Sequence, residues 1–263
     1  MRTTTAGWIS LGLIALTLGL TAISLIDWSG GPLAPTGRIS TPVGHPDEQP
    51  AENLSVAQQV GEADLRILMI GNSHTAPIPG HLQALFAGQQ PERSVLVRRA
   101  LGYGFLVDHA ENKDTLNLIE QEPWDVVILQ AQKYSTSGKY HYPYDGAIKL
   151  AILAQQQGSR VILFPEWSRR DMPDEYRRIN RVHQEIAGIV GADVAPVGQA
   201  WDDWMEQADA GTPTLYAPDG NHASEHGSYL TACVLYCLLV KRPIAGKGRK
   251  SFHDAAWRAV EQD

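Results

Sequence analysis

The sequence lacks the features that mark several specialised classes of protein. Only 2 of its 263 residues are cysteine, which excludes the disulfide framework of a small secreted domain. The formal net charge is −7, so there is no basic excess of the kind found in nucleic-acid-binding domains. Internal repeats and low-complexity tracts are also missing. What remains is the composition of an ordinary globular protein, long enough for one sizeable α/β domain with appendages.

The two cysteines do not form an obvious pair. Cys233 and Cys237 lie four residues apart in an apolar stretch that reads as helix. Two positions on one helical face rarely satisfy the geometry of a disulfide. We therefore expect both residues to be buried free thiols.

One long run without charge stands near the start of the chain. Trp8 to Ile26 contains no charged side chain, and its 19 residues suffice to cross the roughly 30 Å of bilayer hydrocarbon as a helix. No clear cleavage site ends the run, and Trp28 follows where an interfacial aromatic is favourable. Residues 1–28 are therefore predicted to be a membrane anchor, or a signal segment, that places the rest of the chain outside the cytoplasm. The protein is then anchored in the envelope, or secreted if the segment is cleaved.

The remainder divides into a linker, a domain and a tail. Residues 29–62 are rich in proline and glycine and show no apolar periodicity. Proline interrupts helices and central strands alike, so this stretch is predicted to be a linker. The folded domain is expected over residues 63–245. The last residues, 246–263, begin with a basic cluster and are expected to be a C-terminal tail.

Short apolar runs alternate with amphipathic stretches throughout the domain. Strands are predicted over residues 65–70, 94–98, 124–129, 160–164 and 192–195. Helices are predicted over residues 80–89, 107–120, 144–157, 174–190, 199–208 and 224–240. This alternation predicts parallel βαβ units and hence a three-layer α/β/α sandwich with a five-stranded parallel sheet. In such sheets ligands bind beyond the carboxyl ends of the strands.

A candidate nucleophile follows the first predicted strand, in the sequence Gly71-Asn72-Ser73-His74. Gly71 permits a tight turn, which places Ser73 at the mouth of the sheet. A serine needs a base to become nucleophilic, and His74 is poorly placed because adjacent side chains diverge. Taken alone, the motif is weak evidence, because a plain turn after a strand explains it better.

A candidate base lies after the last predicted strand. Asp219 and His222 are three residues apart in a loop, so their side chains can meet. The aspartate can then hold one imidazole nitrogen while the other faces the serine. Taken alone, this pattern also fits an Asp-Gly turn before a helix capped by Ser224. The pattern follows the last strand and Ser73 follows the first. Loops at the same edge of an open sheet can approach each other, so these residues can converge on Ser73.

This ordered set resembles the SGNH (GDSL-like) hydrolase superfamily over about residues 65 to 241. The blocks that resemble a bacterial branch are Gly71 to His74, Trp124 to Gln130, Ala195 to Trp201 and Asp219 to Tyr229. The resemblance implies a flavodoxin-like topology, with Ser73, Asp219 and His222 as the catalytic residues. It also implies an oxyanion hole formed by the Ser73 N–H, a glycine N–H and a side-chain amide.

Two departures from the family pattern affect this site. Gly-Asn-Ser replaces the common Gly-Asp-Ser and leaves the nucleophile in place. The asparagine of the third block is missing, and either Gln130 or Gln132 could supply the amide instead, with Gln130 nearer the strand end. Gly102 and Gly104 are both candidates for the glycine donor, and both also fit a simple turn.

The implied reaction is acyl transfer. His222 takes the proton of Ser73, which attacks an ester carbonyl, and water then releases the acyl group; no metal or cofactor is required. We expect a serine esterase acting on a small acyl ester, for which an O-acetyl group on a carbohydrate is the family analogy. An envelope-anchored acyl transferase or a glycan-binding module is the alternative, because an acyl-enzyme serves hydrolysis and transfer equally. Nucleic acid is not an expected partner, and contact with the membrane is expected through the N-terminal helix.

Other patterns compete with this interpretation. His222 to His226 spells the inverted zinc-peptidase motif H-x-x-E-H, although His222 is expected to precede the helix. Gly102-Tyr103-Gly104 follows the wrong strand for a dinucleotide loop, and Val107 stands where a third glycine belongs. The loops after the third and fourth strands carry residues suited either to sugar stacking or to loop packing: Tyr134, Tyr140, Tyr142, Tyr144, Glu166 and Trp167. His109 and His183 fall in helical patterns and are expected to be surface or packing residues.

Overall fold

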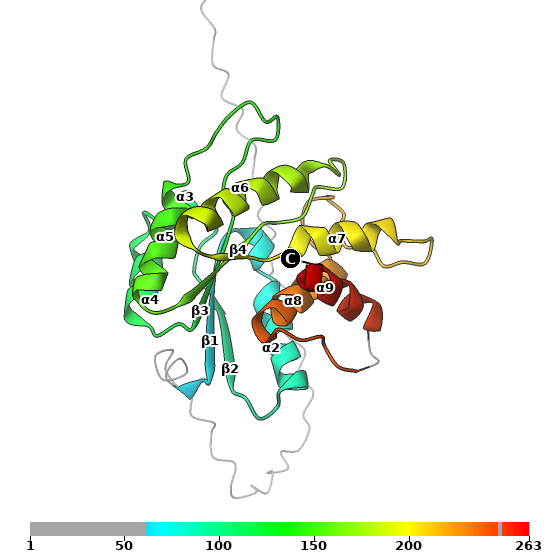
Figure 1. Ribbon diagram of the computed structural model, residues 1–263, viewed down its shortest axis with the longest axis horizontal. Helices are drawn as coiled ribbons and strands as arrows, with labels where there is room; N and C mark the ends of the chain where they lie inside the picture. Colours follow the sequence, from blue (N-terminus) through cyan, green and yellow to red (C-terminus); the bar gives the residue numbers. More distant parts are fainter. Residues whose placement is uncertain (1–61, 247–248, 263) are drawn as a thin grey trace, which may run out of the picture. The chain divides into compact units, whose positions relative to one another are not determined.

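The computed structural model describes residues 62–246 and 249–262 of the chain (Figure 1). The strands are β1 (Leu65–Ile70), β2 (Val95–Arg99), β3 (Val126–Gln130), β4 (Arg160–Phe164) and β5 (Asp193–Val194). The helices are the 3-10 turn η1 (Ser73–Thr75), α2 (Ile78–Gln89), α3 (Leu106–His109), α4 (Lys113–Gln121), α5 (Asp145–Gln156), α6 (Glu175–Val190), α7 (Val197–Glu206), α8 (Glu225–Val240) and α9 (Lys250–Gln262).

The five strands form one parallel sheet in the order β2-β1-β3-β4-β5. This order confirms the predicted flavodoxin-like α/β fold. The chain reverses its direction of winding between β1 and β3, which are neighbours with Ile70 beside Leu129. Ligands of such sheets bind at this switch point, beyond the carboxyl ends of the strands.

Both faces of the sheet are covered, because side chains alternate along each strand. Ile67 and Met69 of β1 belong to a core that α2, α7, α8 and α9 complete. Leu68 and Ile70 point the other way, into a core shared with α3, α4, α5 and α6. Figure 1 shows these two helix groups on opposite sides of the sheet. The apolar runs of the strands therefore follow from burial on both faces.

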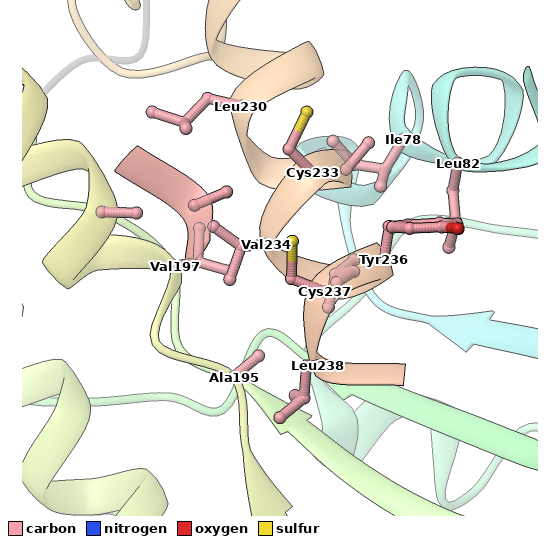
Figure 2. Close-up of a cluster of buried hydrophobic side chains, with 14 of the residues drawn as sticks. Ile78, Leu82, Ala195, Val197, Leu230, Cys233, Val234, Tyr236, Cys237 and Leu238 are labelled. Atoms are coloured by element: carbon pink, nitrogen blue, oxygen red, sulfur yellow. The ribbon is translucent and has the colours of Figure 1, made fainter. Parts of the chain in front are cut away.

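Helix α8 is the most apolar helix of the first core. Figure 2 shows Cys233, Val234 and Cys237 of α8 near side chains from α2 and from the start of α7. Both cysteines are buried and free, which confirms the prediction from their spacing. They act as small apolar side chains, and burial raises the pKa of each thiol above its usual value.

Two predicted elements require correction. The helix predicted over 107–120 is two helices, α3 and α4, because Asn112 caps a new helix by accepting from the Thr115 N–H. The segment predicted as a tail, 246–263, contains α9, which packs on α7 and α8. Its Phe252, Ala255, Ala256 and Ala259 are buried, at the spacing of one helical face.

The predicted anchor or signal segment, residues 1–28, lies outside the described residues, as does nearly all of the predicted linker, residues 29–62. Among the helices from Glu62 onward that the structure describes, none combines the length and apolar character needed to cross a membrane.

Candidate active site

Ser73, the predicted nucleophile, lies on a tight turn directly after β1. Asn72 caps η1 with its side-chain oxygen, which accepts from the His74 N–H at 3.0 Å. Thr75 closes the turn by donating its hydroxyl to the Asn72 carbonyl at 2.8 Å. Gly71 is required here, because a Cβ would lie 2.5 Å from Gln130 Oε1 and 2.8 Å from Thr75 Cγ2. Ser73 is thereby fixed beyond the carboxyl end of the central strand.

His222, the predicted base, lies in a hairpin-like loop between α7 and α8. Tyr216 pairs antiparallel with Ala223, and the Ala217 N–H donates to the His222 carbonyl at 2.8 Å. Gly220 supplies the positive φ, +71°, that the turn between them needs. The turn brings Asp219 and His222 to the same side of the loop.

Ser73, His222 and Asp219 form one hydrogen-bonded series. Ser73 Oγ lies 2.8 Å from His222 Nε2, and His222 Nδ1 lies 2.6 Å from Asp219 Oδ2. The carboxylate can only accept, so Nδ1 carries the imidazole proton and Nε2 is free to accept from the serine hydroxyl. Asp219 also accepts from the N–H groups of Asn221 and His222. The hydrogen bond from His222, with these two, holds the pKa of Asp219 well below its usual range, so the carboxylate stays ionised far into acid.

His74 supports this series from one side. Its ring stacks on the His222 ring with centroids 5.0 Å apart and contacts Trp167 at 5.1 Å. Its Nδ1 lies 3.0 Å from Asn72 Oδ1. Burial, and secondarily the neighbouring His222, lower the pKa of His74 to about 4, so the ring is neutral at physiological pH. His74 therefore packs against the His222 ring as a neutral side chain.

Residues after β4 hold the His222 loop in place. The Trp167 indole donates to the Asn221 carbonyl at 2.9 Å and stacks flat on Trp201, with centroids 4.1 Å apart. The Arg170 N–H donates to the Gly220 carbonyl at 2.9 Å, and its guanidinium donates to the Ala217 carbonyl at 3.0 Å. Of the two readings of Trp167, sugar stacking or loop packing, the structure shows packing.

Two buried histidines have structural partners. His109 Nε2 donates to the Gly71 carbonyl at 3.1 Å, and its Nδ1 lies 3.1 Å from Thr115 Oγ1. His183 Nδ1 donates to the Ile179 carbonyl within α6. His109 was expected to be a surface or packing residue, and its hold on the nucleophile turn is not visible in the sequence. The contact joins residues 38 positions apart.

The two candidate oxyanion glutamines are bound to other groups. Gln130 Oε1 accepts from the Asn72 N–H at 3.1 Å, and its Nε2 donates to Glu166 Oε2. Gln132 Nε2 donates to the carbonyls of Lys133 and Pro143, at 3.0 and 3.2 Å. The arrangement argues against Gln132 as an oxyanion donor, because both its amide protons are engaged. Gln130 instead braces the turn that carries Ser73.

The two candidate glycines differ in their surroundings. Gly102 is exposed with φ +85°, and its carbonyl accepts from Arg99 at 2.6 Å. Gly104 is half-buried beside the Asp108 side chain and adjoins Phe105, which lines the active-site cleft. Within residues 62–246 and 249–262, no hydrogen bond engages the N–H of Ser73 or of Gly104. Within the same described residues, the N–H of Gly102 likewise makes no hydrogen bond.

A cleft of about 710 Å³ opens beside the series formed by Ser73, His222 and Asp219. Its walls are Asn72, His74, Phe105, Lys133, Tyr134, Thr136, Tyr142, Glu166, Arg169, Asp171, Asp219, Gly220 and Asn221. Of the four tyrosines singled out in the sequence, two line this cleft, while Tyr144 donates its hydroxyl to Glu185 at 2.6 Å. His222 and Asp219 retain 41% and 50% of their side-chain exposure, so the site is open to solvent.

The side chains of the H-x-x-E-H pattern do not converge. His222 precedes α8, since Ser224 is the N-cap of that helix. Glu225 pairs with Arg249 at 3.3 Å, and the His226 ring stacks near Phe252. Across the described part of the chain, no group of three or more histidine, cysteine, aspartate or glutamate side chains is arranged to hold a metal ion.

Comparison with known proteins identifies the fold. No family model matches the sequence. No curated protein matches it. Among solved structures, it is similar to a candidate SGNH hydrolase from Slackia heliotrinireducens, with 27% identity over 65% of this chain and 97% of that one, and a TM-score of 0.51. It is also similar to the psychrotrophic esterase EstA from Pseudoalteromonas sp., with 14% identity over 68% and 98% of the two chains and a TM-score of 0.49. The five-stranded parallel sheet with helices on both faces is the fold that the chain shares with the Slackia heliotrinireducens structure.

Proposed function

We propose that the chain is an SGNH (GDSL-like) hydrolase that works as a serine esterase on small acyl esters. The observation that carries the proposal is the hydrogen-bonded series from Ser73 through His222 to Asp219, at the switch point of an SGNH-type sheet. In this fold the carboxyl edge of the sheet is where ligands bind. The roles follow from the atoms: Ser73 Oγ attacks, His222 Nε2 takes the proton, and Asp219 stabilises the imidazolium.

The oxyanion is assigned to backbone donors in this proposal. Neither the Ser73 N–H nor the Gly104 N–H makes a hydrogen bond within the described residues. Gly104 is preferred to Gly102 because it is half-buried and adjoins Phe105 of the cleft wall, whereas Gly102 is exposed. Removing one such donor raises the activation barrier by roughly 3–4 kcal/mol. A carbonyl oxygen placed between these two N–H groups gains negative charge as Ser73 attacks, and the acyl-enzyme forms when the alcohol leaves with the proton from His222.

Hydrolysis is favoured over transfer by the exposure of the triad. His222 is about two-fifths exposed, so water reaches the acyl-enzyme without displacement of a covering segment. His222 then takes a proton from this water, and the hydroxide adds to the ester carbonyl. The bond to Ser73 Oγ breaks as His222 returns the proton to that oxygen, and the acid leaves. An O-acetyl group on a carbohydrate is our preferred substrate, and the sequence-predicted anchor would place the reaction at the bacterial cell envelope.

The test is hydrolysis of 4-nitrophenyl acetate, butyrate and octanoate by the full-length protein and by Ser73→Ala. We expect turnover that declines with acyl length and falls by about 10⁴-fold or more in Ser73→Ala. A fluorophosphonate should label Ser73 stoichiometrically in the wild type. Absence of both turnover and labelling in folded protein would overturn the esterase proposal. Turnover only when a sugar acceptor is present would identify a transferase instead.

A further inference from the structure

Glu166 is the one carboxyl group in the active-site cleft that the triad does not use and that contacts the nucleophile's support. It follows β4 by two residues, and the register of the sheet places Gln130 of β3 beside Phe164. Glu166 therefore reaches Gln130 from the neighbouring strand and accepts a hydrogen bond from its amide nitrogen. The same glutamine holds the Asn72 N–H with its amide oxygen.

The orientation of the Gln130 amide follows from this pair of contacts. Gln130 is fully buried, so both ends of its amide need partners. The Asn72 N–H is a donor and requires the amide oxygen. The nitrogen then faces Glu166, whose carboxylate accepts. Without an acceptor at that end, the amide keeps only the hydrogen bond from Asn72, and its buried nitrogen is left without this partner.

The charges around Glu166 leave it free for this role. Arg169, a cation that also lines the cleft, donates to both oxygens of Glu175, at 3.0 and 2.8 Å. Tyr134 also faces the group from the loop after β3. Burial, together with the nearby Glu175, raises the pKa of Glu166 to about 7, against the opposing effect of the Gln130 hydrogen bond. Glu166 thus changes charge in the neutral range.

We propose that Glu166 is a positioning residue for the nucleophile. It fixes the Gln130 amide, which holds the Asn72 N–H and, through it, the turn that presents Ser73 to His222. The expected effect on catalysis rests on the proposed function. The expected effect on how well the Ser73 turn is ordered does not. The hydrogen bond is strongest when Glu166 is ionised, because charged acceptors bind amide protons more tightly. Positioning is therefore strongest well above pH 7 and weakens as the pH falls through 7.

Four variants separate this role from simple filling of space. Glu166→Ala removes the acceptor and should lower kcat about tenfold with little change in KM, the rate equivalent of one lost hydrogen bond. Glu166→Gln keeps a carbonyl acceptor, so kcat should fall only about twofold. The pH profile of kcat should also lose the part of its acid limb that lies near pH 7.

Gln130→Glu places two carboxyl groups next to each other and should lower kcat more than either Glu166 variant. Adding Glu166→Gln to Gln130→Glu should restore activity, because donor and acceptor have exchanged places. Glu185→Gln, on α6, is the matched control and should leave the rate and its pH profile unchanged.

A readout independent of turnover keeps the two proposals apart. Hydrogen exchange of the Asn72 amide, followed by NMR in the full chain, should be slow in the wild type, faster in Glu166→Ala, and slow again in the exchanged double variant. Unchanged Asn72 exchange in Glu166→Ala overturns the positioning role, as does a loss confined to KM, which would make Glu166 a substrate contact. The wild type could lack esterase activity while Asn72 exchange still differs between wild type and the Glu166 variants as expected. That result would overturn the proposed function and leave the positioning role intact.

Discussion

The two edges of the sheet use polar side chains in opposite ways. At the amino ends of the strands, Arg66 and Asp125 form a bidentate pair at 2.9 and 2.8 Å and satisfy each other. At the carboxyl ends, Gln130 and Glu166 extend from adjacent strands and are linked to the backbone of the Ser73 turn. The pKa values of the two carboxyl groups shift in opposite directions. The hydrogen bond from Arg66 lowers the pKa of Asp125, whereas burial raises the pKa of Glu166. At the amino edge the carboxylate of Asp125 stays ionised and paired. At the carboxyl edge, where we propose the reaction takes place, Glu166 can gain or lose its proton near neutral pH.

If the carboxyl edge serves activity and the amino edge serves stability, the largest loss of activity should come from Asp219→Asn at the carboxyl edge. The new amide would direct an N–H at His222 Nδ1 and favour the tautomer whose proton lies on Nε2, so the base could no longer accept from Ser73. We expect kcat/KM for 4-nitrophenyl acetate to fall about 10³-fold, with melting temperature nearly unchanged. A loss of less than about tenfold would show that Asp219 does not set the tautomer.

Gly71→Ala should have the next largest effect. The added methyl group collides with Gln130 Oε1 and Thr75 Cγ2, so the nucleophile turn must shift. We expect about 10²-fold loss of kcat and roughly 1–3 kcal/mol lower stability, measured by urea unfolding. Gly88→Ala, on α2, where an added Cβ meets nothing within 4 Å, is the control. It should keep full activity and gain about 0.5–1 kcal/mol of stability, and equal losses in the two variants would contradict the special role of the turn.

A pair of tryptophans offers a smaller and more direct test. Trp167 donates to Asn221 at the active edge, and Trp124 donates to Leu118 near the start of β3, at 2.9 and 2.8 Å. Each Trp→Phe substitution removes one hydrogen bond, worth about 1 kcal/mol of stability. Trp167→Phe should also lower kcat about fivefold by loosening the His222 loop, whereas Trp124→Phe should leave kcat unchanged. Equal kinetics in the two variants would show that the loop needs no anchor at Asn221.

The smallest effect is expected at the amino edge. Asp125→Asn breaks a partly exposed ion pair, so we expect about 0.5–1 kcal/mol lower stability at pH 7 and no change in activity. The pKa of Asp125 is lowered in the folded chain, so its contribution is present above the ordinary pKa of about 3.9 and is lost as the pH falls through the lower, folded value. Urea unfolding at a series of pH values should show the difference between wild type and variant shrinking only below about pH 4. A difference that vanishes already near pH 6 would contradict this assignment.

Local sequence signals were sufficient for most of the fold. Runs such as Val126 to Leu129 are apolar on both faces, so strand and burial could be predicted together, and the parallel order followed from the alternation with helices. Helix α9 was missed because its buried face is largely alanine, which gives a weak apolar signal beside charged neighbours. The α3–α4 break was missed because a single asparagine cap decides it.

The site was predictable only where its residues fall into ordered motifs. Ser73, Asp219 and His222 could be named from the sequence, and the structure places their side chains within hydrogen-bond distance. The partner of Gln130 could not be named, because Glu166 lies 36 residues away and meets it only through the register of β3 and β4. Contacts of this kind depend on the sheet as a whole and leave no periodic trace.

The open position of His222 and Asp219 bears on how a large substrate would be processed. With two-fifths to one-half of each side chain exposed, the reacting groups stand on a surface that a polymer can cross sideways, without insertion of a free end. If acyl groups are removed from a polysaccharide, the rate should then follow the density of esters along the chain and not the number of chain termini. Fragmenting such a polymer at constant ester content would leave the initial velocity unchanged.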